Sequence, residues 1–182
     1  PRLSSAEALV RWKHPELGMI SPGDFIPLFE GNGMIGVVDN FVWTEATKQI
    51  ASWKAKFGVI IPVSVNVSRS DVFDLILSEK LERLVKDNGL EFEDLKLEVT
   101  ESAYTDKATT VLNVIKELRN TGYESEMDDF GAGYSSLNML SEMPIDVLKM
   151  DMKFIRNIES STTDRRLVEL IRDIAKFLDV PV

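Results

Sequence analysis

The chain has 182 residues, no cysteine and a formal net charge of −9. The missing cysteines exclude disulfides and thiolate metal sites, and the absence of a basic surface argues against binding to a DNA or RNA polymer. No apolar run reaches the ~18 residues of a membrane span, so we expect no membrane contact by this domain. We expect a cytoplasmic location, and the chain could there be the cytoplasmic part of a membrane-anchored sensor. The length favours a single domain over residues 1–182.

Strand and helix patterns alternate along the chain. The predicted strands cover residues 6–12, 62–67, 95–100, 124–129 and 146–151. The predicted helices cover residues 36–56, a segment from Ser70 as N-cap to Gly89, residues 106–121 and residues 162–178. Strands separated by helices indicate βαβ units and a parallel sheet. No glycine-rich phosphate loop follows any predicted strand, which argues against a Rossmann or P-loop fold.

Each predicted strand carries polar side chains on one of its faces. A parallel strand in an α/β protein is normally apolar on both faces, and burying an unpaired carboxylate is costly. One such residue alone is more simply explained by a salt bridge at a strand end. Because five strands share the pattern, we expect their polar groups to converge at the mouth of a barrel. The residues are Glu7, Asn66, Glu98, Asp128 and Lys149, and oxygen ligands of this kind suit Mg²⁺ or Mn²⁺.

At these residues the chain resembles the EAL domain family of cyclic di-GMP phosphodiesterases. The segment Glu7-Ala8-Leu9 matches the motif that names the family, and further family motifs follow in the family's order. They occupy residues 14–18, 20–27, 64–68, 98–102, 128–137 and 148–151. The resemblance therefore covers nearly the whole chain.

The resemblance implies an α/β fold, a TIM-like (β/α)8 barrel, with its site at the C-terminal ends of the strands. We expect this barrel to be incomplete at both ends, without the usual first strand and the last strands. The implied activity is hydrolysis of cyclic di-GMP to the linear dinucleotide with two Mg²⁺ or Mn²⁺ ions, with Ca²⁺ as an inhibitor. The implied setting is bacterial second-messenger signalling. Cyclic di-GMP, other domains of a larger signalling protein and a second copy in a homodimer are the expected partners.

The resemblance also assigns roles to individual residues. The implied metal ligands are Glu7, Asn66, Glu98 and Asp128, with Asp129 reaching a second ion. The implied catalytic residues are Lys149, Asp129 and Glu101. Lys149 would hold or help to deprotonate the attacking water, and Glu101 would anchor a loop of residues 129–137. The implied substrate contacts are Arg11, Leu9 and Asp151. Glu126 departs from the small residue that many family members carry, and we expect it to perturb the charge of the site.

Two other functions stay open from the sequence. One is a receptor module that binds cyclic di-GMP without cleaving it, although degenerate EAL domains of that kind usually lack several ligands that this chain keeps. The other is a structural or dimerising domain, which would leave the carboxylates unexplained. If the barrel is incomplete, we expect residues 1–182 alone to be inactive or far slower than a longer domain.

Overall fold

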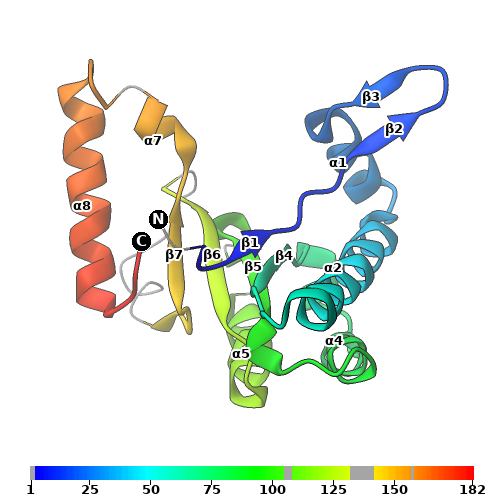
Figure 1. Cartoon of the computed structure of the whole chain (residues 1–182). Coiled ribbons are helices and arrows are strands. Elements are labelled where there is room, and N and C mark those ends of the chain that lie inside the picture. Colours follow the sequence, from blue (N-terminus) through cyan, green and yellow to red (C-terminus); the bar gives the residue numbers. More distant parts are fainter. Residues whose placement is uncertain (1–2, 105–107, 132–141, 157) are drawn as a thin grey trace. The chain divides into compact units, whose positions relative to one another are not determined.

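The computed structural model describes residues 3–104, 108–131, 142–156 and 158–182. The chain divides into two compact units, Pro1–Leu97 and Glu98–Val182. The boundary falls inside a strand, β5, and each unit contains several strands of a β-sheet (Figure 1). The strands are β1 (Ala6–Glu7), β4 (Val63–Asn66), β5 (Leu95–Thr100), β6 (Ser125–Phe130) and β7 (Val147–Met150).

The predicted parallel sheet is present in both units. In the first unit the strand order is β1-β4-β5, and in the second it is β5-β6-β7. The pairs β1–β4 and β6–β7 are parallel. Leu95, Leu97 and Val99 of β5 are fully buried, as expected for a strand covered on both faces.

Helix α2 (Ile35–Phe57) covers β4 in the first unit and confirms the helix predicted over residues 36–56. Trp43 of α2 is buried and donates its indole N–H to the carbonyl oxygen of Asn66 at 2.9 Å. The helix ends at Gly58, whose φ of +67° is in the left-handed region that closes many helices. Helix α2 thereby fixes the backbone at the C-terminal end of β4.

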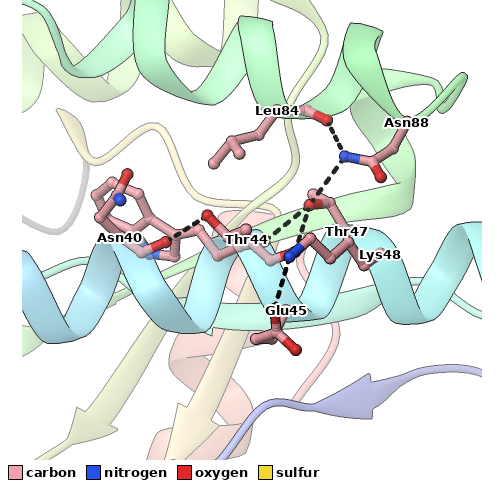
Figure 2. A network of polar contacts seen from close by, with 8 residues as sticks. Asn40, Thr44, Glu45, Thr47, Lys48, Leu84 and Asn88 are labelled. Atoms are coloured by element: carbon pink, nitrogen blue, oxygen red, sulfur yellow. Dashed lines mark hydrogen bonds and ion pairs between the residues drawn. The ribbon is translucent and has the colours of Figure 1, made fainter.

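Polar side chains join α2 to α4 (Leu77–Asp87). Figure 2 shows Asn88 donating to the hydroxyl oxygen of Thr47 at 3.3 Å and to the carbonyl oxygen of Leu84 at 2.8 Å. Thr47 is fully buried and donates to the carbonyl oxygen of Trp43 at 2.9 Å. Each buried polar group here has a hydrogen-bond partner. These hydrogen bonds compensate the cost of removing the groups from water at the contact between the two helices.

The strand predicted over residues 6–12 is wrong beyond Glu7. After β1 the chain leaves the sheet and forms an antiparallel hairpin of β2 (Trp12–His14) and β3 (Gly18–Ile20). An aromatic cluster explains the departure: the Trp12 ring lies 5.6 Å from the rings of both Phe25 and Phe29 on α1 (Pro22–Gly31). This tertiary contact overrides the alternating pattern of the sequence.

The predicted start of a helix at Ser70 is also wrong. Ser68 instead caps a short helix, α3 (Arg69–Val72), and α4 begins only at Leu77. In this capping box the Asp71 N–H donates to Ser68 Oγ, and the Ser68 N–H donates to Asp71 Oδ2, each at 3.3 Å.

The second unit contains the other two predicted helices. They are α5 (Ala108–Thr121) and α8 (Thr162–Leu178), with the short α7 (Met152–Arg156) packed against α8. The guanidinium of Arg119 pairs with both oxygens of Asp146, at 3.0 and 2.6 Å, and Asp146 Oδ2 also accepts from the Ser125 N–H at 2.9 Å. This network ties the end of α5 to the start of β6. Short 3₁₀ turns flank β5 at Phe92–Asp94 and Glu101–Tyr104.

Within the described parts of the chain, no helix combines the length and the apolar composition that crossing a bilayer demands.

Candidate functional site

Three charged side chains meet on the sheet of the second unit. Lys149 Nζ on β7 contacts Glu98 Oε1 on β5 and lies 3.3 Å from Glu126 Oε2 on β6. Glu98 is 1% exposed and Glu126 is 4% exposed. One ammonium therefore faces two buried carboxylates, so it compensates only half of their charge if both are ionised.

The second oxygen of Glu98, Oε2, is buried and accepts no hydrogen bond from any described residue. Leaving a buried carboxylate oxygen without a hydrogen bond or a cation is strongly unfavourable. The position of this atom therefore suits a ligand that supplies positive charge.

A β-bulge presents Asp128 and Asp129 at the end of β6. Met127 pairs with Leu148 and Phe130 with Met150, so β6 carries one residue more than β7 over this stretch. Asp129 adopts a left-handed φ of +55°. A bulge re-aims side chains that strict alternation would send to opposite faces, which lets two consecutive carboxylates serve one site.

The electrostatics around Asp129 also favour a cation. Burial raises the pKa of Asp129 above its usual value, and the negative charges of Asp128 and Asp151 raise this pKa further. The positive charge of Lys153 lowers the pKa of Asp129 in part. The carboxylates here repel one another, and a bound cation would relieve that repulsion.

Glu101 contacts the chain directly after the bulge. Its Oε2 accepts a hydrogen bond from the Gly131 N–H at 2.9 Å, and Glu101 is 2% exposed. Glu101 thus contacts one residue, Gly131, of the loop that it is predicted to anchor, whereas residues 132–137 of that loop lie outside the described residues. The ring of Phe154 lies on the other side: a Cβ added to Gly131 would be 2.7 Å from Phe154 Cε2.

Asp151 caps the short helix α7. Its Oδ1 accepts from the Lys153 N–H at 2.8 Å, and its Oδ2 lies 3.2 Å from Lys153 Nζ. The backbone hydrogen bond from Lys153 holds the pKa of Asp151 below its usual value, helped by the charges of Lys153 and Arg156. Asp151 is thus an ionised group that already has a structural partner.

In the first unit, Glu7 and Asn66 face the same side of the β1–β4 pair. Glu7 pairs with Ser64 in parallel register, and the Ala8 N–H donates to the Ser64 carbonyl oxygen at 2.9 Å. Paired residues point to the same face, and Asn66 shares that face with Ser64 by alternation. The two predicted ligands of this unit therefore lie on neighbouring strand ends, with Glu7 exposed and Asn66 half-buried.

Leu9 and Arg11 follow β1 and border a groove of about 390 Å³. Glu7 also lines this groove, together with Phe41 and Trp53 of α2. Leu9 and Arg11 are both exposed, and the Arg11 guanidinium donates to the carbonyl oxygen of Val10 at 2.8 Å. An exposed guanidinium next to a partly apolar groove suits a ligand that has both phosphate and a flat base.

The donors of the site fit Mg²⁺ or Mn²⁺ by their chemistry. In the part of the chain that the structure describes, no three acidic or histidine side chains stand close enough together to hold an ion as they are. The predicted ligands nevertheless all provide oxygen, and the bare Glu98 Oε2 and the raised pKa of Asp129 each mark a place where positive charge is favourable.

Two neighbours of the site, Lys153 and Phe154, escape the sequence prediction, and a third, Glu126, is predicted only as an acid that perturbs the charge of the site. Glu126 is identifiable only as an unusual acid, and its contact with Lys149 needs the register of β6 against β7. Lys153 could have been found from its position two residues after Asp151, because an aspartate often caps the N–H two residues on. Nothing in the sequence indicates the contact of Phe154 with Gly131.

A comparison with protein families finds one match, to the family described as EAL domain, over residues 1–182. The cyclic di-GMP phosphodiesterase PdeR of Escherichia coli is 35% identical over 178 residues, which cover 98% of this chain and 27% of PdeR. The cyclic di-GMP phosphodiesterase PA2567 of Pseudomonas aeruginosa is 34% identical, over 97% of this chain and 30% of that protein. The chain thus spans less than a third of the length of these relatives.

Solved structures give the same picture. The PaMucR phosphodiesterase in its c-di-GMP complex matches with a TM-score of 0.92 and 33% identity, over 99% of this chain and 72% of that one. The EAL enzyme Bd1971, in a form bound to cAMP and cyclic di-GMP, matches with a TM-score of 0.90 and 29% identity, over 97% of this chain and 49% of that one. The predicted fold class, a TIM-like α/β barrel present in part, is confirmed.

Proposed function

Because the chain belongs to the EAL domain family, we propose that it hydrolyses cyclic di-GMP to the linear dinucleotide with the help of two divalent cations. The observation that carries the proposal is Glu98, a fully buried carboxylate whose Oε2 has no donor among the described residues and whose Oε1 contacts Lys149. A buried carboxylate with one oxygen that no described donor reaches suits the binding of a cation next to the ammonium group of Lys149. The relatives named cyclic di-GMP phosphodiesterases and the PaMucR complex with c-di-GMP support the choice of substrate.

The proposed ligands of the ions are the strand-end oxygens. Glu7, Asn66, Glu98 and Asp128 hold the first ion, and Asp129 reaches the second. The chemistry that such cations supply is charge neutralisation at the phosphate and activation of water. Mg²⁺ and Mn²⁺ suit this donor set, whereas Ca²⁺ accepts looser geometries and is proposed to bind without supporting turnover.

The remaining residues position the reactants. Lys149 donates a hydrogen bond to the attacking water and holds it for in-line approach to phosphorus. Arg11 pairs with phosphate oxygens, and Leu9 contacts a base of the substrate. Asp151, which caps the start of α7, is a further proposed substrate contact. The water oxygen loses a proton and forms the new bond to phosphorus, the bond from phosphorus to the 3′ oxygen breaks, and the 3′ oxygen takes up a proton.

The test is a turnover assay of the chain with cyclic di-GMP and Mn²⁺, with the linear dinucleotide quantified by chromatography. Glu98→Gln keeps the shape of the side chain and removes its charge, so the rate should fall on the order of a thousandfold, because residues of one site act as a unit. Glu169→Gln, an exposed charge on α8, serves as control and should leave the rate unchanged. Absence of linear dinucleotide with Mn²⁺ and with Mg²⁺ would refute hydrolysis by residues 1–182 alone, and the same absence in a longer protein that contains them would refute the proposed function.

A second function, binding of cyclic di-GMP without hydrolysis, is favoured by one observation. Lys149 lies directly on Glu98, so a cation must displace an ammonium group before it can bind there. If this displacement fails, the groove next to Arg11 could still bind the nucleotide. Calorimetry that detects cyclic di-GMP binding in the absence of any turnover with Mn²⁺ would support this function.

The cellular setting is also proposed. The chain spans less than a third of its curated relatives, so we propose that it works together with other domains of a larger signalling protein in the cytoplasm. A homodimer belongs to the same proposal.

A further inference from the structure

Glu126 is a buried charge of the site, 4% exposed, to which the proposed function gives no task. We propose that Glu126 is a positioning residue that retains the ammonium group of Lys149 when a divalent cation takes over Glu98. The inference rests on the cation site of the proposed function and adds a residue to it.

The geometry places Lys149 between two carboxylates of the same unit. Its Nζ contacts Glu98 Oε1 and lies 3.3 Å from Glu126 Oε2. The shorter contact is with Glu98, the proposed cation ligand, and the longer one is with Glu126. A small movement of the flexible lysine side chain toward Glu126 would release Glu98 without moving the ammonium group into solvent.

Burial makes a second carboxylate necessary for this movement. The side chains of Glu98 and Glu126 are 0% and 4% exposed, and that of Lys149 is 29% exposed. If Glu98 were the sole counter-ion, a cation binding to Glu98 would take this carboxylate away from the ammonium group. Glu126 keeps one carboxylate next to the ammonium group, at 3.3 Å, and a partly buried ammonium is costly without such a partner.

The strand register explains why Glu126 is placed for this task. Glu126 pairs with Val147 in parallel register, so its side chain shares a face with that of Lys149, two residues further along β7. The bulge begins only after Met127. Glu126 therefore lies in the regularly paired part of β6, whereas Asp128 and Asp129 lie in the bulge.

Glu98 Oε2, which no described donor reaches, marks a place where positive charge is favourable. This atom is buried and has no donor among the described residues, although Lys149 contacts the other oxygen of the same carboxylate. A cation at Oε2 therefore competes with Lys149 for the same carboxylate. The ammonium group remains close enough to hold the attacking water because Glu126 keeps it there.

Calorimetric titration of the chain with Mn²⁺ tests the proposal without any measurement of turnover. Glu126→Gln should weaken Mn²⁺ binding about tenfold, since the loss of one charge-assisted contact typically has this effect. In a Lys149→Met background the same substitution should change the affinity by less than about twofold, because no ammonium competes for Glu98. Glu169→Gln removes an exposed charge of the same unit and should leave the affinity unchanged.

Glu126→Asp provides a second variant that keeps the charge and shortens the reach. It should weaken Mn²⁺ binding in the Lys149 protein if the contact matters, and circular dichroism should show that each variant folds. An equal loss from Glu126→Gln in both backgrounds, no loss in either, or no Mn²⁺ binding to the unsubstituted chain would overturn the proposal. If the substitutions of Glu126 and Lys149 are coupled in Mn²⁺ binding but the chain does not hydrolyse cyclic di-GMP, only the proposed activity is refuted.

Discussion

Asp39 and Asp71 form a pair of carboxyl groups inside the first unit. Asp39 lies on α2 and Asp71 on α3, and they are 7% and 6% exposed. Burial raises the pKa of Asp39 to about 8, and a hydrogen bond to Asp71 and the charge of Asp71 act in the same direction. Asp39 Oδ2 is buried and meets no donor among the described residues, which fits a protonated acid better than a carboxylate.

This pair predicts that stability falls with rising pH. In the unfolded chain Asp39 ionises near its ordinary pKa of 3.8, whereas in the folded chain it stays protonated up to about 8. Between these values the folded state binds more protons than the unfolded state, so the free energy of unfolding should decrease as the pH rises toward 8 and then level off.

Asp39→Asn mimics the protonated acid and should remove most of this slope, so that the variant is more stable than the unsubstituted chain at pH 9. Urea unfolding at pH 5, 7 and 9 measures the effect. A parallel decline of both proteins over this range would show that other groups cause the pH dependence.

Glu7 and Arg11 should differ in their effects on catalysis. Glu7 lies at the end of β1 as a proposed ion ligand, and Arg11 lies beyond the strand with its guanidinium exposed. Glu7→Ala should abolish hydrolysis, whereas Arg11→Ala should raise KM about tenfold or more with a smaller effect on kcat, because it removes a charged hydrogen bond to the substrate. Steady-state kinetics with Mn²⁺ separates the two, and equal effects on KM and kcat in both variants would contradict this division.

At the scale of elements, helices were predicted better than strand ends. The range of α8 agrees with the sequence prediction at both ends, because its apolar stripe and its capping Ser161 are local signals. The strand through Trp12 and the helix start at Ser70 failed, because an aromatic cluster and a capping box decide them. Glu7 and Asn66 are the last residues of β1 and β4, whereas Glu98 and Asp128 lie within their strands. The bulge that aims Asp129 depends on a register that no local pattern encodes.

Gly131, directly after β6, and Phe154 on α7 should be coupled in their effects on stability. Gly131 has a φ of +91°, and an added Cβ would lie 2.7 Å from Phe154 Cε2. Gly131→Ala should therefore cost about 2 kcal/mol of stability, of which about 1 kcal/mol comes from the left-handed backbone. In a Phe154→Ala background the steric part disappears and only the backbone part should remain, as measured by chemical denaturation.

Gly58→Ala is the matched control for this cycle. Gly58 also has a positive φ, +67°, but an added Cβ would meet no atom within 4 Å. Its substitution should cost about 1 kcal/mol in either background. If Gly131→Ala costs the same with and without the Phe154 ring, that ring does not restrict position 131.

At the scale of the whole molecule, ligand binding should be visible as added stability. A ligand at a hundred times its Kd contributes about 2.7 kcal/mol, which corresponds to a rise in Tm of about 5–10 °C for a chain of this size. We expect such a rise with Ca²⁺ and cyclic di-GMP together, without formation of product. Thermal scans with and without the pair of ligands measure the effect.

Glu98→Gln provides the reference for that scan. It removes a proposed ion ligand, so the rise in Tm should shrink to that produced by the nucleotide alone. An unchanged rise in this variant would mean that the cation stabilises the protein through residues other than Glu98.

The boundary between the two compact units lies within β5, between Leu97 and Glu98, rather than in a loop. A cut at this point would divide a strand whose residues Leu95, Leu97 and Val99 are fully buried, and each half would expose unpaired backbone groups and apolar side chains. Neither half should therefore be recoverable as a folded protein of its own. For the same reason, either half could be exchanged for a foreign segment only by rebuilding this strand.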